Sequence, residues 1–206
     1  MNIPKSFKDV KVGEYIKLRP ILDADYDNPL SKTIDLLSVF NDRDEVLKCK
    51  ASELKEVDFL YTVPNGTLKQ YFEINGKQYG IVNHVNDLEA GQYISVVTLL
   101  KDLADNPNLS YELIHDVLSC VIFPVDKDKK VLNIEPGYFR KLADDIYKHM
   151  SIEDAYPIAL FFLTLSANLM RTTQDSLNQK QVEMMKMAEK LTLEVQKDLE
   201  RDGVGS

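Results

Sequence analysis

The sequence predicts a mainly α-helical protein with a small β-hairpin, an α+β fold made of two tandem helical repeat units and a long C-terminal helix. Three observations lead to this prediction. A pattern at residues 10–18 recurs at 88–96, a hairpin signal lies between the two copies, and residues 172–201 contain neither Gly nor Pro. We therefore expect a first helical repeat unit over residues 1–65, the hairpin and a second repeat unit over 66–171, and an extended C-terminal helix over 172–206.

The repeat rests on two short signals in one register. Gly-x-Tyr-Ile occurs at residues 13–16 and again at 91–94, and Asp-Asn-Pro occurs at 27–29 and at 105–107, both at an offset of 78 residues. Two further pairs of segments match in the same order once insertions are allowed in the second copy: 34–39 with 115–120, and 44–48 with 144–148. Each copy would be a unit of helices that cannot bury its apolar face alone, whereas two copies packed together can. The alternative is coincidence among short matches.

The composition indicates a soluble globular chain and limits its partners. The 206 residues suit one compact domain or two small ones, and 44% apolar content is enough for a sizeable core. A formal charge of -8, without any block of Lys or Arg, argues against nucleic acid as the main partner. The longest apolar run, residues 158–165, is shorter than the roughly 18 residues that a membrane span needs. Cys49 and Cys120 cannot form a disulfide framework and no signal peptide opens the chain, so we expect a reducing cytoplasm.

The first unit begins with a helix and an acidic loop. Residues 10–22 favour a short helix, or a turn followed by a helix, interrupted by Gly13 and Pro20. The loop 23–28 carries carboxylates at alternate positions, as the opening of a calcium-binding loop does. Its sixth position is not Gly and its twelfth is not Glu, so a loop that caps the next helix explains these residues better.

Three more helices are expected in the first unit. Ser31 is the predicted N-cap of a helix over residues 32–40, whose apolar residues give it one buried side. Short helices are also predicted over residues 42–48 and 52–61.

A β-hairpin is expected over residues 68–82. Asn75-Gly76 separates two alternating segments, and both residues tolerate the positive φ angles of a type I′ turn. Because an isolated two-stranded hairpin is marginal in water, this one must pack on helices or gain strands from elsewhere. Its edge is also a candidate docking site for a partner.

The second unit repeats the helices over residues 88–123 and then adds an insertion. The insertion holds a charged turn at 124–130 and a short apolar segment at 131–134. A helix follows over residues 138–150, and the segment 151–154 has the form of a capping box.

Pro157 is expected to interrupt the next helical stretch. Proline is poorly tolerated in a helix interior, so either a kink lies there or a new helix starts near Tyr156. Residues 158–170 are apolar on all sides, which is typical of a helix buried in the core or in a neighbouring protein.

The C-terminal residues 172–201 favour a helix with one narrow apolar row. Such a row packs on the same chain or forms a seam for another chain, and we take it as the candidate partner-binding site. An unbroken helix from Tyr156 to Arg201 would reach roughly 70 Å, which is longer than any domain of this chain. The row consists of Leu177, Met184, Ala188, Leu191 and Val195.

The residues that catalysis or metal binding would use form no recognisable motif. Cys120 lies in an apolar segment, where burial would raise its pKa and make it inert. Asp144 and Asp145 point to different sides of their helix and cannot act as a pair. We therefore predict no enzyme activity, no cofactor and no metal. The three histidines, scattered without metal-ligand spacing and expected at the surface or at an interface, are His84, His115 and His149.

The centre of the chain resembles a group of small proteins of tailed bacteriophages. The segments 71–79 and 88–94 carry the resemblance, which extends over roughly residues 68–170. The proteins in question are encoded among the structural genes of crAss-like and related phages that infect Bacteroidetes. The resemblance implies a virion component or an assembly factor, such as a tail-assembly chaperone, a neck component or a capsid-packaged protein. It supplies no functional residues.

The sequence thus leaves three classes of function open. We favour a non-catalytic phage virion or assembly protein that contacts other virion proteins through the C-terminal helix and the hairpin, located in the virion or the host cytoplasm. It is also a candidate homo-oligomer. The second class is an intracellular adaptor or regulator that binds a peptide or a helix. The third is an enzyme whose active-site residues are dispersed along the sequence.

Overall fold

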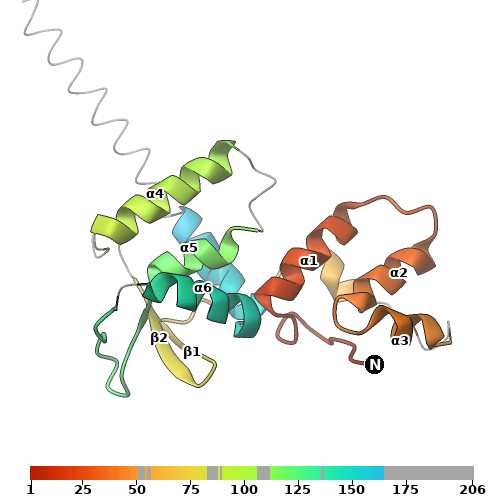
Figure 1. The fold of residues 1–206 in the computed structure, drawn as a ribbon, viewed down its shortest axis with the longest axis horizontal. Coiled ribbons are helices and arrows are strands. Elements are labelled where there is room, and N and C mark those ends of the chain that lie inside the picture. The colour runs from red at the N-terminus through yellow and green to blue at the C-terminus, as the bar shows by residue number, and fades with distance from the viewer. Residues whose placement is uncertain are drawn as a thin grey trace, which may run out of the picture. The chain divides into compact units, whose positions relative to one another are not determined.

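The structure is a computed structural model that describes residues 1–50, 54, 57–82, 88, 90–105, 112–135 and 137–164. Residues Met1–Leu163 form one compact unit, and Thr164–Ser206 form another. The described part combines helices with a small antiparallel sheet, which confirms the predicted α+β class (Figure 1). The predicted C-terminal helix lies outside the described residues, and the predicted boundaries of the two repeat units stay predictions.

The chain starts with α1 (Val12–Asp23), which confirms the helix predicted over residues 10–22. Lys11 is its N-cap, and the carboxylate of Glu14 accepts a hydrogen bond from the Lys11 amide at 2.7 Å. α1 continues through Pro20. This proline removes one intrahelical hydrogen bond but does not end the helix.

The second helix, α2 (Pro29–Ser38), begins three residues before the predicted start. Asn28 is its N-cap and accepts a hydrogen bond from the Leu30 amide at 2.9 Å. Pro29 then occupies the first helical position, where its fixed φ angle is favourable and its missing N–H costs nothing. The prediction of Ser31 as the N-cap was therefore wrong. The acidic loop does end in a capping residue, as predicted.

Two short helical segments complete the first half. α3 (Arg43–Lys48) has Asp42 as its N-cap, whose carboxylate accepts from the Asp44 amide at 2.9 Å and the Glu45 amide at 3.3 Å. The 3₁₀ helix η2 (Asp58–Tyr61) covers only the end of the helix predicted over 52–61: residues 54 and 57 are not helical, and residues 52, 53, 55 and 56 lie outside the described residues.

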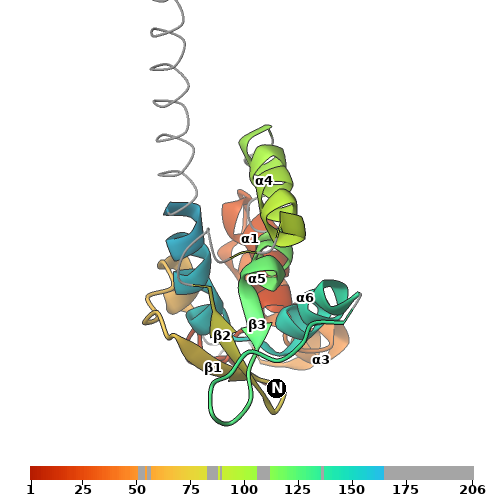
Figure 2. The ribbon, with the colours of Figure 1, turned by 90° about the vertical axis from the view of Figure 1, so that its left-hand side faces the viewer.

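The predicted hairpin is confirmed in β1 (Tyr71–Ile74) and β2 (Lys77–Ile81). Asn75 and Gly76 have φ angles of 50° and 74°, as a type I′ turn requires. The hairpin also gains a third strand, β3 (Ile122–Pro124), which pairs antiparallel with β2 (Figure 2). The sequence had placed residues 122 and 123 in a helix.

The second half contains α4 (Ala90–Asp105), α5 (Ile114–Val121) and α6 (Tyr138–His149). A further helix is described over residues 152–164. The hydroxyl of Ser151 accepts from the Asp154 amide at 3.2 Å and donates to the Asp154 carboxylate at 2.8 Å, which confirms the predicted cap. The described part contains no helix long and apolar enough to cross a membrane.

The helix over residues 152–164 passes through Pro157, so of the two predicted alternatives the start of a new helix near Tyr156 was wrong. Pro157 cannot donate to the carbonyl oxygen of Glu153, four residues earlier. Gly66 packs against that same oxygen so closely that an added Cβ would lie 1.8 Å from it. The absence of a side chain at Gly66 therefore lets the segment 62–70 approach the first turn of this helix.

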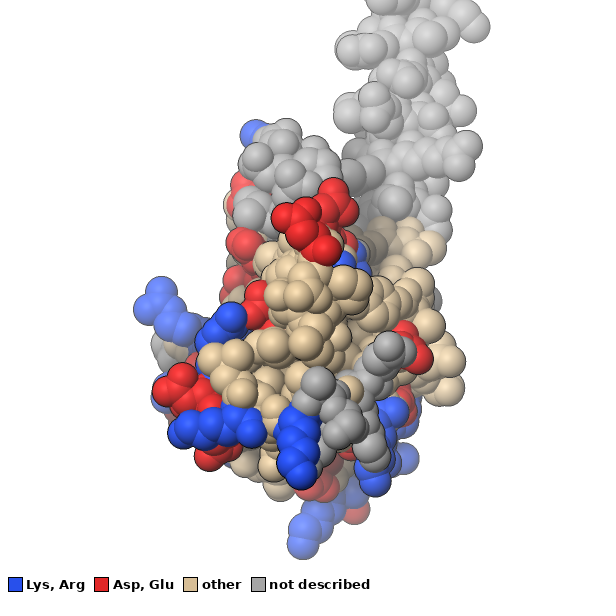
Figure 3. Space-filling model, turned by 90° about the vertical axis from the view of Figure 1, so that its right-hand side faces the viewer, with Lys and Arg blue, Asp and Glu red and all other residues tan. Residues whose placement is uncertain are grey.

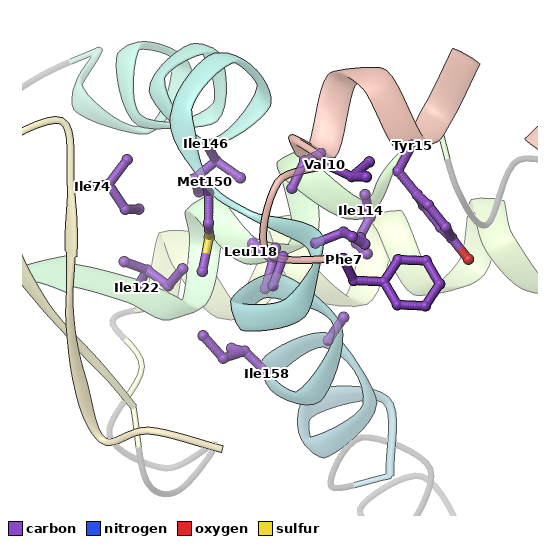
Figure 4. Packing of buried hydrophobic residues seen from close by; sticks show 14 of the residues in the cluster. Phe7, Val10, Tyr15, Ile74, Ile114, Leu118, Ile122, Ile146, Met150 and Ile158 are labelled. Atoms are coloured by element: carbon purple, nitrogen blue, oxygen red, sulfur yellow. The ribbon is translucent and has the colours of Figure 1, made fainter. Parts of the chain in front are cut away.

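One continuous core joins these elements (Figure 4). Two main-chain hydrogen bonds tie the beginning of α1 to the junction after α6: the Val12 amide donates to Met150 at 3.0 Å, and the Ile152 amide donates to Val10 at 2.8 Å. The labelled side chains that converge from the N-terminal segment, β1, α5, α6 and the helix 152–164 include Phe7, Val10, Ile74, Leu118, Ile146 and Ile158.

The segments matched by the sequence repeat fall in helices of the same order. Gly13 and Gly91 are each the second residue of a helix, α1 and α4. The other two matched pairs lie in α2 and α5, and in α3 and α6. In each half the first helix contacts the second and the second contacts the third. The equivalent positions that are buried in both halves are Leu18 and Val96, Leu36 and Val117, Leu37 and Leu118, and Val46 and Ile146.

Candidate functional site

The outward side of α4 carries apolar side chains that the described part of the chain leaves exposed. Tyr93, Ile94 and Val97 are 39%, 64% and 37% exposed. Val97 lies next to both of the others on one helix side, because it is four residues after Tyr93 and three after Ile94, and residues three and four apart are close on the surface of an α-helix. We refer to Tyr93, Ile94 and Val97 as the α4 surface.

The opposite side of α4 fixes this helix to the rest of the fold. Gln92 and Val96 are buried, and Leu99 packs at the margin of the core. The side-chain amide of Gln92 donates to the carbonyl oxygen of Cys120 in α5 at 3.3 Å. α4 is thus held by Gln92, Val96 and Leu99 on one side, and this orientation turns the α4 surface outward.

The residue of the first half that matches Tyr93 in the sequence is covered by the chain itself. Tyr15 in α1 corresponds to Tyr93 and is only 2% exposed. The ring of Phe7 lies 6.2 Å from the ring of Tyr15 in an edge-to-face arrangement, and Phe59 in turn lies 5.1 Å from Phe7. Aromatic pairs in this geometry contribute beyond their buried area. The packing of Phe7 on Tyr15, with Phe59 behind it, therefore shows that an aromatic side chain suits such a helix surface.

The acidic loop between α1 and α2 is held by ion pairs and hydrogen bonds. The ammonium of Lys32 donates to the carbonyl oxygens of Leu22 at 2.8 Å and Ala24 at 3.0 Å, at the C-terminal end of α1. Positive charge is favourable there because the carbonyl groups of the last turn lack helical partners. These hydrogen bonds account for how the loop is held after α1. Within the described residues, no group of three or more His, Cys, Asp or Glu residues is arranged to hold a metal ion.

A second cluster joins the loop to α3. The Tyr26 hydroxyl donates to the Asp35 carboxylate at 2.9 Å, and the Arg43 guanidinium pairs with the same carboxylate. The hydrogen bond from Arg43, with a further one from Tyr26, lowers the pKa of Asp35. The pKa of Tyr26 is raised by its bond to Asp35. Both shifts favour the ionised carboxylate and the neutral phenol, which is the state of a stable ion pair.

A third cluster anchors the helix over residues 152–164. The Lys69 ammonium donates to the Asp154 carboxylate at 2.6 Å, beside the Ser151 cap. Burial alone would raise the pKa of Asp154, but the hydrogen bonds from Lys69 and Ser151 outweigh it and leave that pKa below its usual value. The cluster fastens the segment after η2 to this helix.

Cys120, His115 and His149 have the structural settings that the sequence indicated. Burial raises the pKa of the Cys120 thiol, as predicted, so little of it is thiolate near neutral pH. The His115 ring packs edge-on against the ring of Tyr147 at 5.3 Å, at a contact between α5 and α6. His149 lies in the last turn of α6, and His84 lies outside the described residues.

Two tyrosines share a buried site at the junction of the sheet and α6. Burial raises the pKa of Tyr79, and the nearby carboxylate of Asp145 raises it further. Burial raises the pKa of Tyr138 strongly, and the neighbouring Tyr79 raises it further. Phenols in this state stay protonated near neutral pH and serve packing rather than proton transfer.

The predicted partner-binding residues and the α4 surface are different parts of the chain. Leu177, Met184, Ala188, Leu191 and Val195 all lie outside the described residues. In the sequence, Tyr93 and Ile94 stand out only as part of the matched Gly-x-Tyr-Ile pattern. One signal points to them: the N-terminal half of α4 holds more apolar residues than one buried side can use.

The charged side chains show no extended surface of one sign on the side of the molecule nearest α1–α3. Figure 3 shows Lys and Arg side chains interspersed with Asp and Glu side chains around an uncharged area, within the described residues. The argument against nucleic acid as the main partner stays a prediction from the net charge of -8.

Comparison with known proteins gives no family for this chain. No protein-family model, no curated protein and no solved structure matches it.

Proposed function

We propose that this protein is a non-catalytic bacteriophage virion or assembly protein that acts through protein–protein contacts. The observation that carries the proposal is the α4 surface, where Tyr93, Ile94 and Val97 are exposed on a helix whose other side is fixed in the core. Exposed apolar groups on one helix side are typical of a surface that a partner covers. The resemblance of residues 71–79 and 88–94 to small phage structural proteins supplies the biological setting.

The first half of the chain indicates the chemistry of the partner. Phe7 reaches Tyr15 from an irregular N-terminal segment and covers α1 there. By analogy, the proposed partner of α4 is a segment of another virion or assembly protein that places an aromatic side chain against Tyr93 and Ile94. Full burial of one such side chain contributes roughly 1.5–3 kcal/mol, which suits a contact that forms during assembly.

The proposal includes an internal duplication of a three-helix unit. Its support is the common order of the matched helices and the four equivalent pairs of residues that are buried in both halves. An experimentally determined structure tests this directly. The backbone of α1–α3 should superpose on that of α4–α6 once the insertions are removed, and the lack of any such superposition would refute the duplication.

Mass spectrometry of purified phage particles, with copy number, tests the function. Particles assembled with Ile94→Asp should contain at least tenfold less of this protein than particles assembled with the wild type, because a buried unpaired carboxylate destabilises an apolar contact. Leu47→Asp is the matched control, since Leu47 is an exposed apolar residue on α3. Equal copy numbers for Ile94→Asp and wild type would contradict the proposed contact, as would the absence of the wild-type protein from both particles and assembly intermediates.

The same surface also favours the second function, an intracellular adaptor that binds a peptide or a helix. A helix side with Tyr93, Ile94 and Val97 can accept an amphipathic helix as readily as an extended segment. Pull-down from host lysate that contains no virion protein distinguishes the two functions. An Ile94-dependent host partner would favour the adaptor, and a partner found only in infected cells would favour the virion protein.

A further inference from the structure

The outer edge of β1 presents main-chain groups that the sheet does not use. The order of the sheet is β1-β2-β3, so β1 has a neighbour on one side only. Phe72 pairs with Tyr79 and Ile74 with Lys77, and the Ile81 amide donates to Gln70 at 3.2 Å. Hydrogen-bonding direction alternates along an antiparallel strand. The N–H and C=O groups of Tyr71 and Glu73 therefore point away from β2.

Within the described residues, no strand pairs with this edge. No helix or strand is drawn along the outer side of β1 in Figure 1 or Figure 2. Phe72 and Ile74 are buried on the core side of the sheet, whereas Glu73 is exposed and Tyr71 is half-buried on the other side. The edge is thus short, open and accompanied by two side chains that face solvent.

The charges beside the edge are arranged in a complementary way. The ammonium of Lys129, in the turn after β3, lies 4.7 Å from the centroid of the Tyr71 ring. The carboxylate of Glu73 lies two residues further along the same side of the strand and accepts a hydrogen bond from Gln78 at 3.0 Å. A positive charge therefore accompanies Tyr71, and a negative charge accompanies Glu73.

We propose that this edge pairs with β1 of a second copy of the chain, antiparallel, so that Tyr71 of each copy lies opposite Glu73 of the other. In this register the outward groups of Tyr71 and Glu73 form hydrogen-bonded pairs, and the two copies of Phe72 face each other at the two-fold axis. Side chains directly opposite on an antiparallel pair are about 5 Å apart. Glu73 of one copy thus lies beside Lys129 of the other, and symmetry repeats the contact.

The charges also exclude the neighbouring register. A register shifted so that Glu73 faces Glu73 of the second copy would place two carboxylates together, which is unfavourable in a strand pair. Charge beside an edge strand commonly discourages pairing. Here the acidic residue and the lysine are spaced so that a copy of the same edge satisfies both. The occupant that fits is therefore a second copy of this chain, and the product is a continuous sheet of both copies.

Sedimentation velocity of the full-length chain over a range of concentrations tests the proposal by charge reversal. Glu73→Lys and Lys129→Glu should each weaken self-association about tenfold or more, because each places two like-charged pairs in the interface. An equimolar mixture of these two variants should associate as the wild type does, since each supplies the charge that the other needs. The double variant Glu73→Lys/Lys129→Glu should also self-associate as the wild type does.

Lys127→Glu is the matched control. It changes the net charge by the same amount in the same turn as Lys129→Glu, and it should leave self-association unchanged. Circular dichroism establishes that every variant is folded. A wild-type chain that stays monomeric, association that is insensitive to all the substitutions, or a mixture that fails to recover would each overturn the proposal. The α4 surface is not part of this edge, so Ile94→Asp should leave self-association unchanged whether or not the proposed function holds.

Discussion

Replacing the two repeat-equivalent glycines with alanine should change stability in opposite directions. A Cβ on Gly13 would lie 2.5 Å from Cε1 of Tyr147, whereas a Cβ on Gly91 would meet no atom of the described residues within 4 Å. The Tyr147 ring must therefore move by about 1 Å to restore ordinary contact. Overpacking typically costs about 1–3 kcal/mol, and Ala gains up to about 1 kcal/mol over Gly in a helix. We expect Gly13→Ala to lose up to about 2 kcal/mol and Gly91→Ala to gain up to about 1 kcal/mol.

Urea denaturation followed by circular dichroism measures both effects. Tyr147→Ala, introduced alone and with Gly13→Ala, completes a double-mutant cycle. The penalty of Gly13→Ala should disappear once the Tyr147 ring is absent, because the three nearest atoms that the new Cβ would meet all belong to that ring. The reasoning is refuted if both Gly→Ala substitutions shift stability in the same direction by the same amount, or if the Gly13→Ala penalty persists without the ring.

Three further predictions concern single contacts. Asp154→Asn should make the free energy of unfolding less dependent on pH in the acid range. The pKa of Asp154 is lowered in the folded state, so its carboxylate stabilises the fold above about pH 5, and this stabilisation is lost as the pH falls through the folded pKa. Urea titrations from pH 7 to pH 3 would detect the difference. Gly76→Ala should cost about 1 kcal/mol, because its φ of 74° disfavours a side chain, and an unchanged urea midpoint would contradict the type I′ turn. Lys32→Met should cost about 1 kcal/mol through loss of the bonds to Leu22 and Ala24, whereas the exposed control Lys17→Met should be neutral in the same assay.

The elements that the sequence predicted are those with local signals. Asn75-Gly76 specifies its turn through two residues that tolerate positive φ, and Asp42 and Ser151 cap helices through their own side chains. The strand β3 was missed because Ile122–Pro124 become a strand only by pairing with β2, about forty residues earlier in the chain. Non-local pairing of this kind leaves no pattern within the segment itself.

Two errors arose where a neighbouring segment decides the outcome. Ser31 carries a good capping side chain, but Asn28 followed by Pro29 starts α2 earlier. Pro157 was expected to kink a helix or to lie at the start of a new one near Tyr156, and the second alternative fails because the helix already begins at Ile152 and passes through Pro157, with Gly66 against the carbonyl oxygen of Glu153. In both cases the competing residue was visible in the sequence, but the contact was not.

The candidate site was the least predictable part of the molecule. Tyr15-Ile16 and Tyr93-Ile94 are identical in sequence, but Phe7 packs on Tyr15 and Phe59 packs on Phe7, whereas Tyr93 and Ile94 are exposed among the described residues. Exposure depends on what the rest of the chain places next to a helix. The sequence could therefore identify the matched residues but could not show which of them the described part of the chain leaves exposed.

Site-specific photo-cross-linking at position 94 tests the central claim most directly. A photoreactive side chain in place of Ile94 is compared with one in place of Leu47, which is also exposed and apolar. In purified phage particles, the account predicts a cross-link from position 94 to a second virion protein and none from position 47. Equal labelling from both positions, or no cross-link from position 94 in particles that contain the protein, would contradict it.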